Sequence, residues 1–295
     1  MAVIKVGSKN YQEFLRKRFE LERRILEEDG YKVQITEIEQ GDTLFFECSV
    51  KEDNLIFVIL KEFIANIVSD LIINHLELDF LYKILDINCT QLQQKEKNKI
   101  INGALNRLNI LSSSTDEKIK AKIKRKNRIL LEILDYITAG QEIVVEGFVR
   151  FRLKNYLAEL ELAVKKAIEE YGVEKEYRGF VHLLKYYIDM QLGNSKLVNV
   201  IKLNNNHFKL LDQNKEIIET PFLDKYVLDQ LQEELEQQDL VISALISLTP
   251  QEIILHFKHP FALVEQLKNI FQERLSICLG CEYCKLKSLK ELTEK

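Results

Sequence analysis

The sequence predicts an α+β protein in which a predominantly helical middle region is flanked by short N- and C-terminal parts that contain β-strands. Apolar residues recur at helical spacing through most of residues 54–191. Residues 31–50 have the alternation and the central glycine of a β-hairpin, and residues 252–278 read as strand, helix and strand. We therefore expect three parts, at residues 1–53, 54–193 and 194–295.

The N-terminal part should contain a strand, a helix and a hairpin in that order. Residues 2–6 are typical of a short strand, and Ser8 is placed to cap a helix at 9–28. Two further strands, at 31–38 and 43–50, form the hairpin.

The middle region is predicted to be helical almost throughout. The periodicity predicts helices near 54–76, 78–87, 91–111, 115–138, 147–171 and 174–191. Turn-forming residues predict breaks at 112–115, 139–142 and 171–173.

The C-terminal part is predicted to combine a hairpin with a βαβ unit. The hairpin strands are expected at 197–203 and 208–211, followed by helices near 223–236 and 240–247. The last unit consists of a strand at 252–257, a helix at 261–271 and a strand at 274–278. A strand, a helix and a strand in this order predict two parallel strands that end at the same edge of a sheet.

The composition indicates a folded cytoplasmic protein without a membrane span. The chain has 46% hydrophobic and 30% charged residues, with only 10 glycines and 3 prolines, which argues against long linkers. Residues 55–85 are the most apolar stretch, but polar residues interrupt them at helical spacing, so we expect a buried helix there. The N-terminus lacks the apolar segment of a secretory signal. The net charge of −4 gives no global basic field for nucleic acid.

The usual catalytic sequence patterns are absent. The sequence contains neither a glycine-rich phosphate loop nor a G-x-S-x-G or H-E-x-x-H motif. No base, nucleophile and orienting partner occur in a recognisable arrangement. We therefore expect no enzymatic activity.

Three of the five cysteines lie within seven residues and predict a metal site. Cys278, Cys281 and Cys284 have the spacing C-x2-C-x2-C, and two thiolates two residues apart can bind one ion. In a reducing cytosol such a cluster is expected to bind Zn²⁺, with the three sulfurs roughly 4 Å apart. His256 nearly ends the preceding strand, so His256 or His259 is expected to supply the fourth ligand.

Two alternatives to zinc remain open for this cluster. The spacing C-x2-C-x2-C also opens the bacterial ferredoxin sequence, which predicts an iron–sulfur cluster. However, the next cysteine of that sequence would stand at position 288, where this chain has Ser288. The other alternative is three reduced thiols without a metal.

A basic helix and a pair of arginines are further candidate binding sites. The basic residues of the helix at 115–138 are Lys118, Lys120, Lys122, Lys124, Arg125, Lys126 and Arg128. No aromatic side chain lies among them for base stacking, so a solvated helix face is the favoured interpretation and nucleic-acid or acidic-partner binding the alternative. For E-G-F-V-R-F-R-L at 146–153 a structural role in packing is the favoured interpretation, and binding of a carboxylate or phosphate by Arg150 and Arg152 is the alternative. Arg152 is expected to be partly buried and paired.

Three segments also carry a family resemblance. They read E-G-F-V-R-F-R-L-K-N-Y from residue 146, E-K-E-Y-R-G-F-V-H-L-L-K-Y-Y-I-D-M-Q at 174–191 and C-L-G-C-E-Y-C at 278–284. Together they resemble the YtxC-like family of sporulation proteins from endospore-forming bacteria. The residues that match are Gly147, Phe148, Phe151, Arg152, Tyr177, Asp189, Cys278, Gly280, Cys281 and Cys284.

The resemblance implies a process and a setting but no reaction. It implies a cytosolic protein of the sporulation programme. The absence of catalytic patterns and the strong helical packing patterns favour a factor that contacts another protein of that programme. The residues leave two other function classes open, namely an iron–sulfur or thiol-redox protein that uses the cysteine cluster, and a nucleic-acid-binding protein that uses the basic helix at 118–128.

Overall fold

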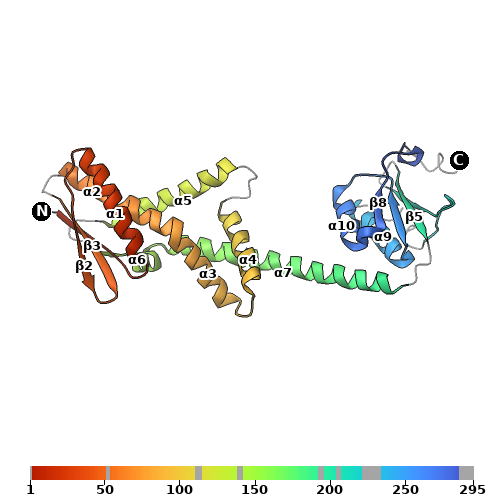
Figure 1. Cartoon of the computed structure of the whole chain (residues 1–295), viewed down its shortest axis with the longest axis horizontal. Coiled ribbons are helices and arrows are strands. Elements are labelled where there is room, and N and C mark those ends of the chain that lie inside the picture. Colours follow the sequence, from red (N-terminus) through yellow and green to blue (C-terminus); the bar gives the residue numbers. More distant parts are fainter. Residues whose placement is uncertain are drawn as a thin grey trace. The chain divides into compact units, whose positions relative to one another are not determined.

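The chain forms two compact units, which we describe separately. A computed structural model describes residues 2–50, 54–109, 115–137, 142–191, 196–203, 207–220 and 234–285 (Figure 1). The first unit spans Met1–Val173 and the second Glu174–Lys295. Each contains a four-stranded sheet together with helices, which confirms the predicted α+β class.

The sheet of unit 1 is built from the predicted N-terminal strands and one short later strand. Its strands are β1 (Ala2–Ser8), β2 (Gln34–Gln40), β3 (Thr43–Val50) and β4 (Glu142–Val144). They lie in the order β2-β3-β1-β4. The antiparallel pairing of β2 with β3 confirms the predicted hairpin. The pairing of β1 with β4 is parallel, and the sequence did not predict it.

The first helix begins later than predicted because another helix binds the residues before it. Helix α1 spans Gln12–Glu28 rather than 9–28. Glu146 Oε1 accepts hydrogen bonds from the hydroxyl of Ser8 (2.7 Å) and from the backbone N–H groups of Lys9 (3.1 Å) and Asn10 (3.3 Å). Ser8 Oγ in turn accepts a hydrogen bond from the backbone N–H of Tyr11. These contacts hold the residues before α1 in a turn.

The remaining helices of unit 1 follow the predicted order, except that the single helix expected at 147–171 is interrupted at Leu153. They are α2 (Asn54–Leu71), a π-helical turn (Ile72–Leu76), α3 (Glu77–Asn88), α4 (Gln94–Leu108), α5 (Thr115–Tyr136), α6 (Val145–Arg152) and the first part of α7 (Lys154–Met190). The gap expected between helices at 76 and 78 is wrong, since Leu76 and Glu77 both have helical backbone angles. The side chain of Glu77 can be buried there because its carboxylate is paired with Arg125.

A second expected break, within helix α7, is also wrong. The sequence predicted a break at residues 171–173, but α7 runs without interruption from Lys154 to Met190. One glycine inside a helix costs only about 1 kcal/mol relative to alanine, and the good helix formers around Gly172 offset this. Residues 112–114 and 139–141 of the other two predicted breaks lie outside the described residues.

One hydrophobic core holds unit 1 together. It includes Ile4 of β1, Ile64 of α2 and Ala167 of α7. Phe19 of α1 stacks on Phe46 of β3 with ring centroids 5.0 Å apart. Residues from before and after position 53, the first boundary of the predicted three-part division, therefore contribute to the same core. The three-part division itself stays a prediction.

Unit 2 contains the predicted hairpin and the predicted βαβ arrangement. Its elements are β5 (Leu197–Lys202), β6 (Phe208–Leu211), α9 (Glu234–Leu248), β7 (Glu252–Leu255), α10 (Phe261–Phe271) and β8 (Leu275–Ile277). The strand order is β6-β5-β7-β8. Strands β5, β7 and β8 are parallel to one another, whereas β6 is antiparallel to β5. Residues 223–233 of the predicted helix at 223–236 lie outside the described residues.

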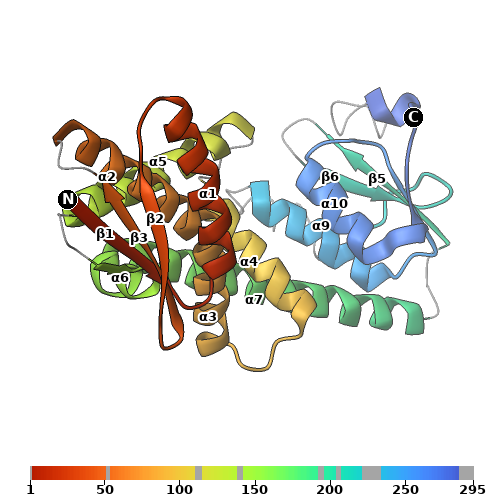
Figure 2. The same cartoon turned by 60° about the vertical axis from the view of Figure 1, so that its left-hand side comes forward.

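The core of unit 2 is separate from that of unit 1. Helices α9 and α10 lie beside the sheet in Figure 2, and Leu245 and Leu267 from these helices share a core with Val198 and Leu255 from the strands. Ile188 of α7 belongs to the same core.

The long apolar segment of unit 1 is a buried helix, as the sequence predicted. Leu60, Ile64 and Ile67 of α2 are fully buried. None of the described helices combines the length with the apolar composition that a bilayer crossing requires.

Candidate metal centre

Two parallel strands place the first two candidate ligands at one edge of the sheet. His256 directly follows β7 and Cys278 directly follows β8. The backbone N–H of His256 donates to the carbonyl of Val200 over 2.9 Å, and that of Cys278 donates to the carbonyl of Leu255 over 2.9 Å. Because sheet hydrogen bonds fix both backbones, the two side chains leave the same edge at defined positions.

A tight turn and a short helix bring the other two cysteines back to this edge. Gly280 has a φ of 133°, a conformation that residues with a Cβ rarely adopt. A 3-10 helix at Glu282–Lys285 follows, in which the N–H of Cys284 donates to the carbonyl of Cys281 over 3.2 Å. The sulfurs of Cys281 and Cys284 consequently lie 3.9 Å apart.

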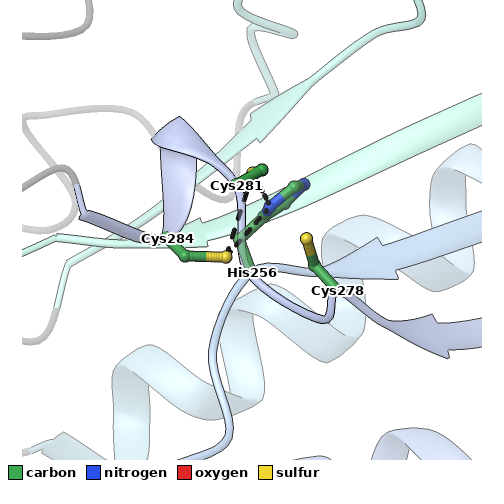
Figure 3. Close-up of side chains that lie close together, drawn as sticks. All are labelled: His256, Cys278, Cys281 and Cys284. Carbon is green, nitrogen blue, oxygen red and sulfur yellow. Dashed lines mark hydrogen bonds between the residues drawn. The ribbon is translucent and has the colours of Figure 1, made fainter.

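The four side chains surround a common centre (Figure 3). One ligand atom from each of His256, Cys278, Cys281 and Cys284 lies within 4.8 Å of every other. His256 Nδ1 lies 3.1 Å from the sulfur of Cys281 and 3.6 Å from that of Cys284. A tetrahedral Zn²⁺ ion with ordinary bond lengths requires about 3.8 Å between sulfurs and about 3.6 Å between sulfur and nitrogen. The spacing therefore suits one small ion.

A hydrogen-bond chain determines which ring nitrogen of His256 carries the proton and which one has a free lone pair. The side-chain amide of Asn199 in β5 donates from Nδ2 to the carbonyl of Asp212 over 3.2 Å. Its oxygen therefore faces His256 Nε2, at 3.0 Å. Since an amide oxygen can only accept, Nε2 carries the proton and Nδ1 is left free to bind a metal. This is the outer contact that metal-binding histidines usually have.

The surroundings of His256 favour its neutral ring. Burial lowers the pKa of His256 below its ordinary value. The ring of Tyr283 meets it edge-on with centroids 5.8 Å apart. Tyr283 itself packs against a small buried cluster from β5 and β6, and the ammonium group of Lys215 lies 5.3 Å from the centre of its ring. Tyr283 therefore anchors the loop that carries Cys281 and Cys284.

The thiols of the metal-free cluster differ from one another in acidity. Burial alone would raise the pKa of Cys281, but hydrogen bonds from the backbone of Cys284, from the side chain of Cys278 and from the backbone of Tyr283 lower it overall. Burial raises the pKa of Cys284, and the neighbouring sulfurs of Cys278 and Cys281 add to the effect. These surroundings favour the thiolate of Cys281 over that of Cys284.

The sequence named two histidines as possible fourth ligands, and the structure brings only His256 to the cysteines. His259 is not part of the four-residue group. Its ring instead meets that of Phe261 edge-on with centroids 4.3 Å apart. His259 lies three residues beyond His256, whose backbone N–H makes the last sheet hydrogen bond of this segment.

The basic helix α5 directs two of its cations into unit 1. Arg125 is only 4% exposed, and its Nη2 lies 3.1 Å from Glu77 Oε1. The hydroxyl of Tyr156 donates to the other oxygen of Glu77 over 2.8 Å. Lys126 pairs with Asp70 over 2.6 Å. These two residues serve the packing of unit 1, whereas Lys122 is exposed.

The arginines of α6 lie at the surface. Arg150 and Arg152 are both exposed, so the expected burial of Arg152 is wrong. Helix α6 ends at Arg152, and Leu153 enters the core in its place. The guanidinium of Arg152 lies 5.0 Å from the centre of the Tyr136 ring, a cation–π contact.

Comparison with known proteins identifies the family. The model of the YtxC-like family matches residues 62–276. The chain belongs to the YtxC-like family. The match ends two residues before Cys278, so the metal centre rests on the geometry of this chain rather than on the family match.

A curated relative is similar to part of the chain. Uncharacterized protein YtxC of Bacillus subtilis (strain 168) is 27% identical over 158 residues, which are 53% of this chain and 55% of that protein. The chain thus spans about half the length of the curated relative it matches. No solved structure matches this chain.

Proposed function

We propose that the protein is a non-enzymatic cytosolic factor of the sporulation programme that works through protein contacts, and that unit 2 is stabilised by a structural Zn²⁺ ion. The ligands are His256 Nδ1 and the sulfurs of Cys278, Cys281 and Cys284. The observation that carries the metal assignment is the convergence of these four atoms within 4.8 Å.

The ligand set supports a structural rather than a catalytic ion. Structural zinc sites have four protein ligands, whereas catalytic zinc sites keep one position open for water or substrate. Three sulfurs and one imidazole nitrogen complete a tetrahedron. An ion held in this way has no position at which to activate a water molecule.

The sulfur spacing supports one ion over an iron–sulfur cluster. In a [4Fe–4S] cluster each cysteine sulfur binds a different iron atom, so the sulfurs lie farther apart than sulfurs that share one ion. Cys281 and Cys284 are 3.9 Å apart, close to the value of about 3.8 Å that a tetrahedral zinc ion requires.

A thiol-redox function is the second candidate. It is favoured by the short distance between Cys281 and Cys284 and by the lowered pKa of Cys281, since a thiolate is the reactive form of cysteine. For nucleic-acid binding, α5 retains the exposed Lys122, while Arg125 and Lys126 are paired within unit 1.

The sporulation role rests on the family resemblance. The segment at 174–191 and the E-G-F-V-R-F-R segment lie within the residues matched by the family model. The absence of a catalytic sequence pattern and the closed ligand set support a factor that binds other proteins.

Metal analysis of anaerobically purified protein tests the metal assignment. We expect one zinc per chain in the wild type and none in Cys278→Ser or Cys281→Ser. The control variant Cys89→Ser should retain the zinc, because Cys89 caps the C-terminus of α3 in unit 1. Iron with acid-labile sulfide in the purified protein would favour the cluster instead. Fully reduced protein that holds no metal, even after incubation with zinc, would contradict the assignment.

A further inference from the structure

Within unit 2, helix α7 carries two sets of apolar residues, which lie on different sides of the helix. Ile188 lies in the core of unit 2, and Val181 and Leu184 pack against that core. A second set faces away from it and is between 48 and 66% exposed. We call this set the outer stripe, and it consists of Phe180, Leu183, Tyr186, Tyr187 and Met190.

The spacing of the outer stripe is that of a helix that pairs with another helix. Phe180, Leu183, Tyr187 and Met190 follow one another at intervals of three, four and three residues, the repeat of the a and d positions of a coiled coil. Tyr186 lies beside this seam. A helix that only needed to cover the core of unit 2 would have polar residues at these positions.

The outer stripe forms a continuous apolar patch that is larger than a few scattered exposed residues would give. From their exposed fractions, the five side chains present on the order of 500 Å² of accessible surface, at the upper end of the largest patch on a typical monomer. Two such stripes in contact would bury about 1,000 Å² before flanking residues are counted, which reaches the lower bound for a specific interface.

The charge distribution indicates the partner. None of the five residues of the outer stripe is acidic or basic, and Glu176, four residues before Phe180, marks the N-terminal limit of the stripe. The charges within residues 179–190 are directed elsewhere, as Lys185 contacts Gln272 and Asp189 pairs with Arg274 at 2.8 Å. A two-fold symmetric contact places each surface against its own copy, so any net charge would repel itself. A stripe of aromatic residues, leucine and methionine without charge has no such conflict.

We propose that the outer stripe of α7 binds the same stripe of a second copy of this chain and forms a two-fold symmetric dimer. The contact is a short helix-to-helix seam made by Phe180, Leu183, Tyr187 and Met190, with Tyr186 at its margin. The dimer requires neither the metal ion nor the sporulation role proposed above, so its test is independent of both.

Sedimentation velocity of the full-length chain over roughly a hundredfold range of micromolar concentrations tests the dimer. We expect twice the monomer mass of 34.7 kDa at high concentration. Leu183→Glu should give a monomer at all concentrations, because a carboxylate would be buried in the seam. The matched control is Leu131→Glu on α5, which is 63% exposed and lies in unit 1; it should behave as the wild type.

A milder variant keeps the test valid if Leu183→Glu fails to fold. Leu183→Ala retains the helix and should weaken dimerisation about tenfold, as removal of a central interface side chain does. A wild-type chain that is monomeric throughout, or a Leu183→Ala chain that dimerises as tightly as the wild type, would overturn the proposal. A monomer would leave the stripe to a different protein partner.

Discussion

Asn199 accepts a hydrogen bond from Nε2 of His256 over 3.0 Å, and the two residues come from neighbouring parallel strands. This contact selects the tautomer in which Nδ1 faces the three cysteines. We expect Asn199→Leu to lower the affinity for zinc about 10- to 100-fold, the usual effect of losing such an outer contact. Competition with a chromogenic zinc chelator measures the affinity.

Asn199→Asp is the matched comparison for that experiment. It keeps an oxygen acceptor opposite His256 and loses the N–H that donates to Asp212. Its loss of zinc affinity should therefore be smaller than that of Asn199→Leu. Equal affinities in the leucine variant and the wild type would show that the contact with Asn199 does not tune metal binding by His256.

Removal of the metal should loosen unit 2 and leave unit 1 unchanged. The ligands all belong to unit 2, whose hydrophobic core shares no buried residue with that of unit 1. On chelation we expect amide hydrogen exchange to accelerate at least tenfold, which corresponds to about 1.4 kcal/mol, in β7, β8 and α10. Exchange in α2 is the internal control. Equal acceleration in both units, or none in unit 2, would contradict a structural role of the ion.

The buried pair of Glu77 and Arg125 should be far more sensitive to loss of one partner than an exposed pair. Arg125→Met leaves the carboxylate of Glu77 buried with Tyr156 as its remaining donor among the described residues, so we expect unit 1 to lose about 3–5 kcal/mol of unfolding free energy. The control is Arg128→Met, which breaks an exposed pair with Glu159 and should cost at most about 1 kcal/mol. Urea unfolding measures both.

A double variant separates the pair's own contribution from the penalty of an unpaired charge. Glu77→Leu combined with Arg125→Met removes both buried charges, so it should be more stable than Arg125→Met alone. A double variant less stable than the single one would mean that packing, rather than the unpaired carboxylate, causes the loss.

Cys48 should make unit 1 less stable at alkaline pH. Burial raises the pKa of the Cys48 thiol, and the Glu47 carboxylate adds to this effect. The contribution is fully present below the unfolded pKa of about 8.5, and it declines above that value because only the unfolded chain loses its proton there. Between pH 9 and 10 the wild type should lose about 1 kcal/mol more unfolding free energy than Cys48→Ala. Parallel pH profiles of the two chains would contradict this.

Deletion of the gene in its host should reduce spore yield or spore quality while vegetative growth stays normal. The expectation follows from the proposed sporulation role. Heat-resistant spore counts and growth rates measure the two effects, and reintroduction of the wild-type gene is the control. Slow vegetative growth together with normal spores would count against the role.

Part of the candidate site followed from the sequence because its elements are local. The strand, helix and strand order at 252–278 predicted the parallel pair of β7 and β8. Parallel strands end at one edge, which placed His256 near Cys278. The choice between His256 and His259 depended on the residue at which β7 ends, and the sequence does not define strand ends to within three residues.

Other parts of the structure could not be predicted because their partners lie far apart in the chain. Glu77 and Arg125 are separated by 48 positions, and Asn199 and His256 by 57. A single sequence shows each of these side chains as an ordinary polar residue on a helix or strand. The continuous helix α7 escaped prediction for another reason, since a glycine beside a valine is typical of a turn but is tolerated in a helix that is packed at both ends.

His256 precedes α10 and the cysteines follow it, so an ion held between them closes a loop of roughly 20 residues around that helix. Such a closure acts as a reversible cross-link, and a covalent loop of similar size removes about 3 kcal/mol of chain entropy from the unfolded state. With the proposed zinc ion, this stabilisation would grow with the ratio of free ion to dissociation constant, so the folded fraction of this part of the chain would depend on cellular zinc supply. A shortage of the ion would then reduce the amount of intact protein without any change in its synthesis.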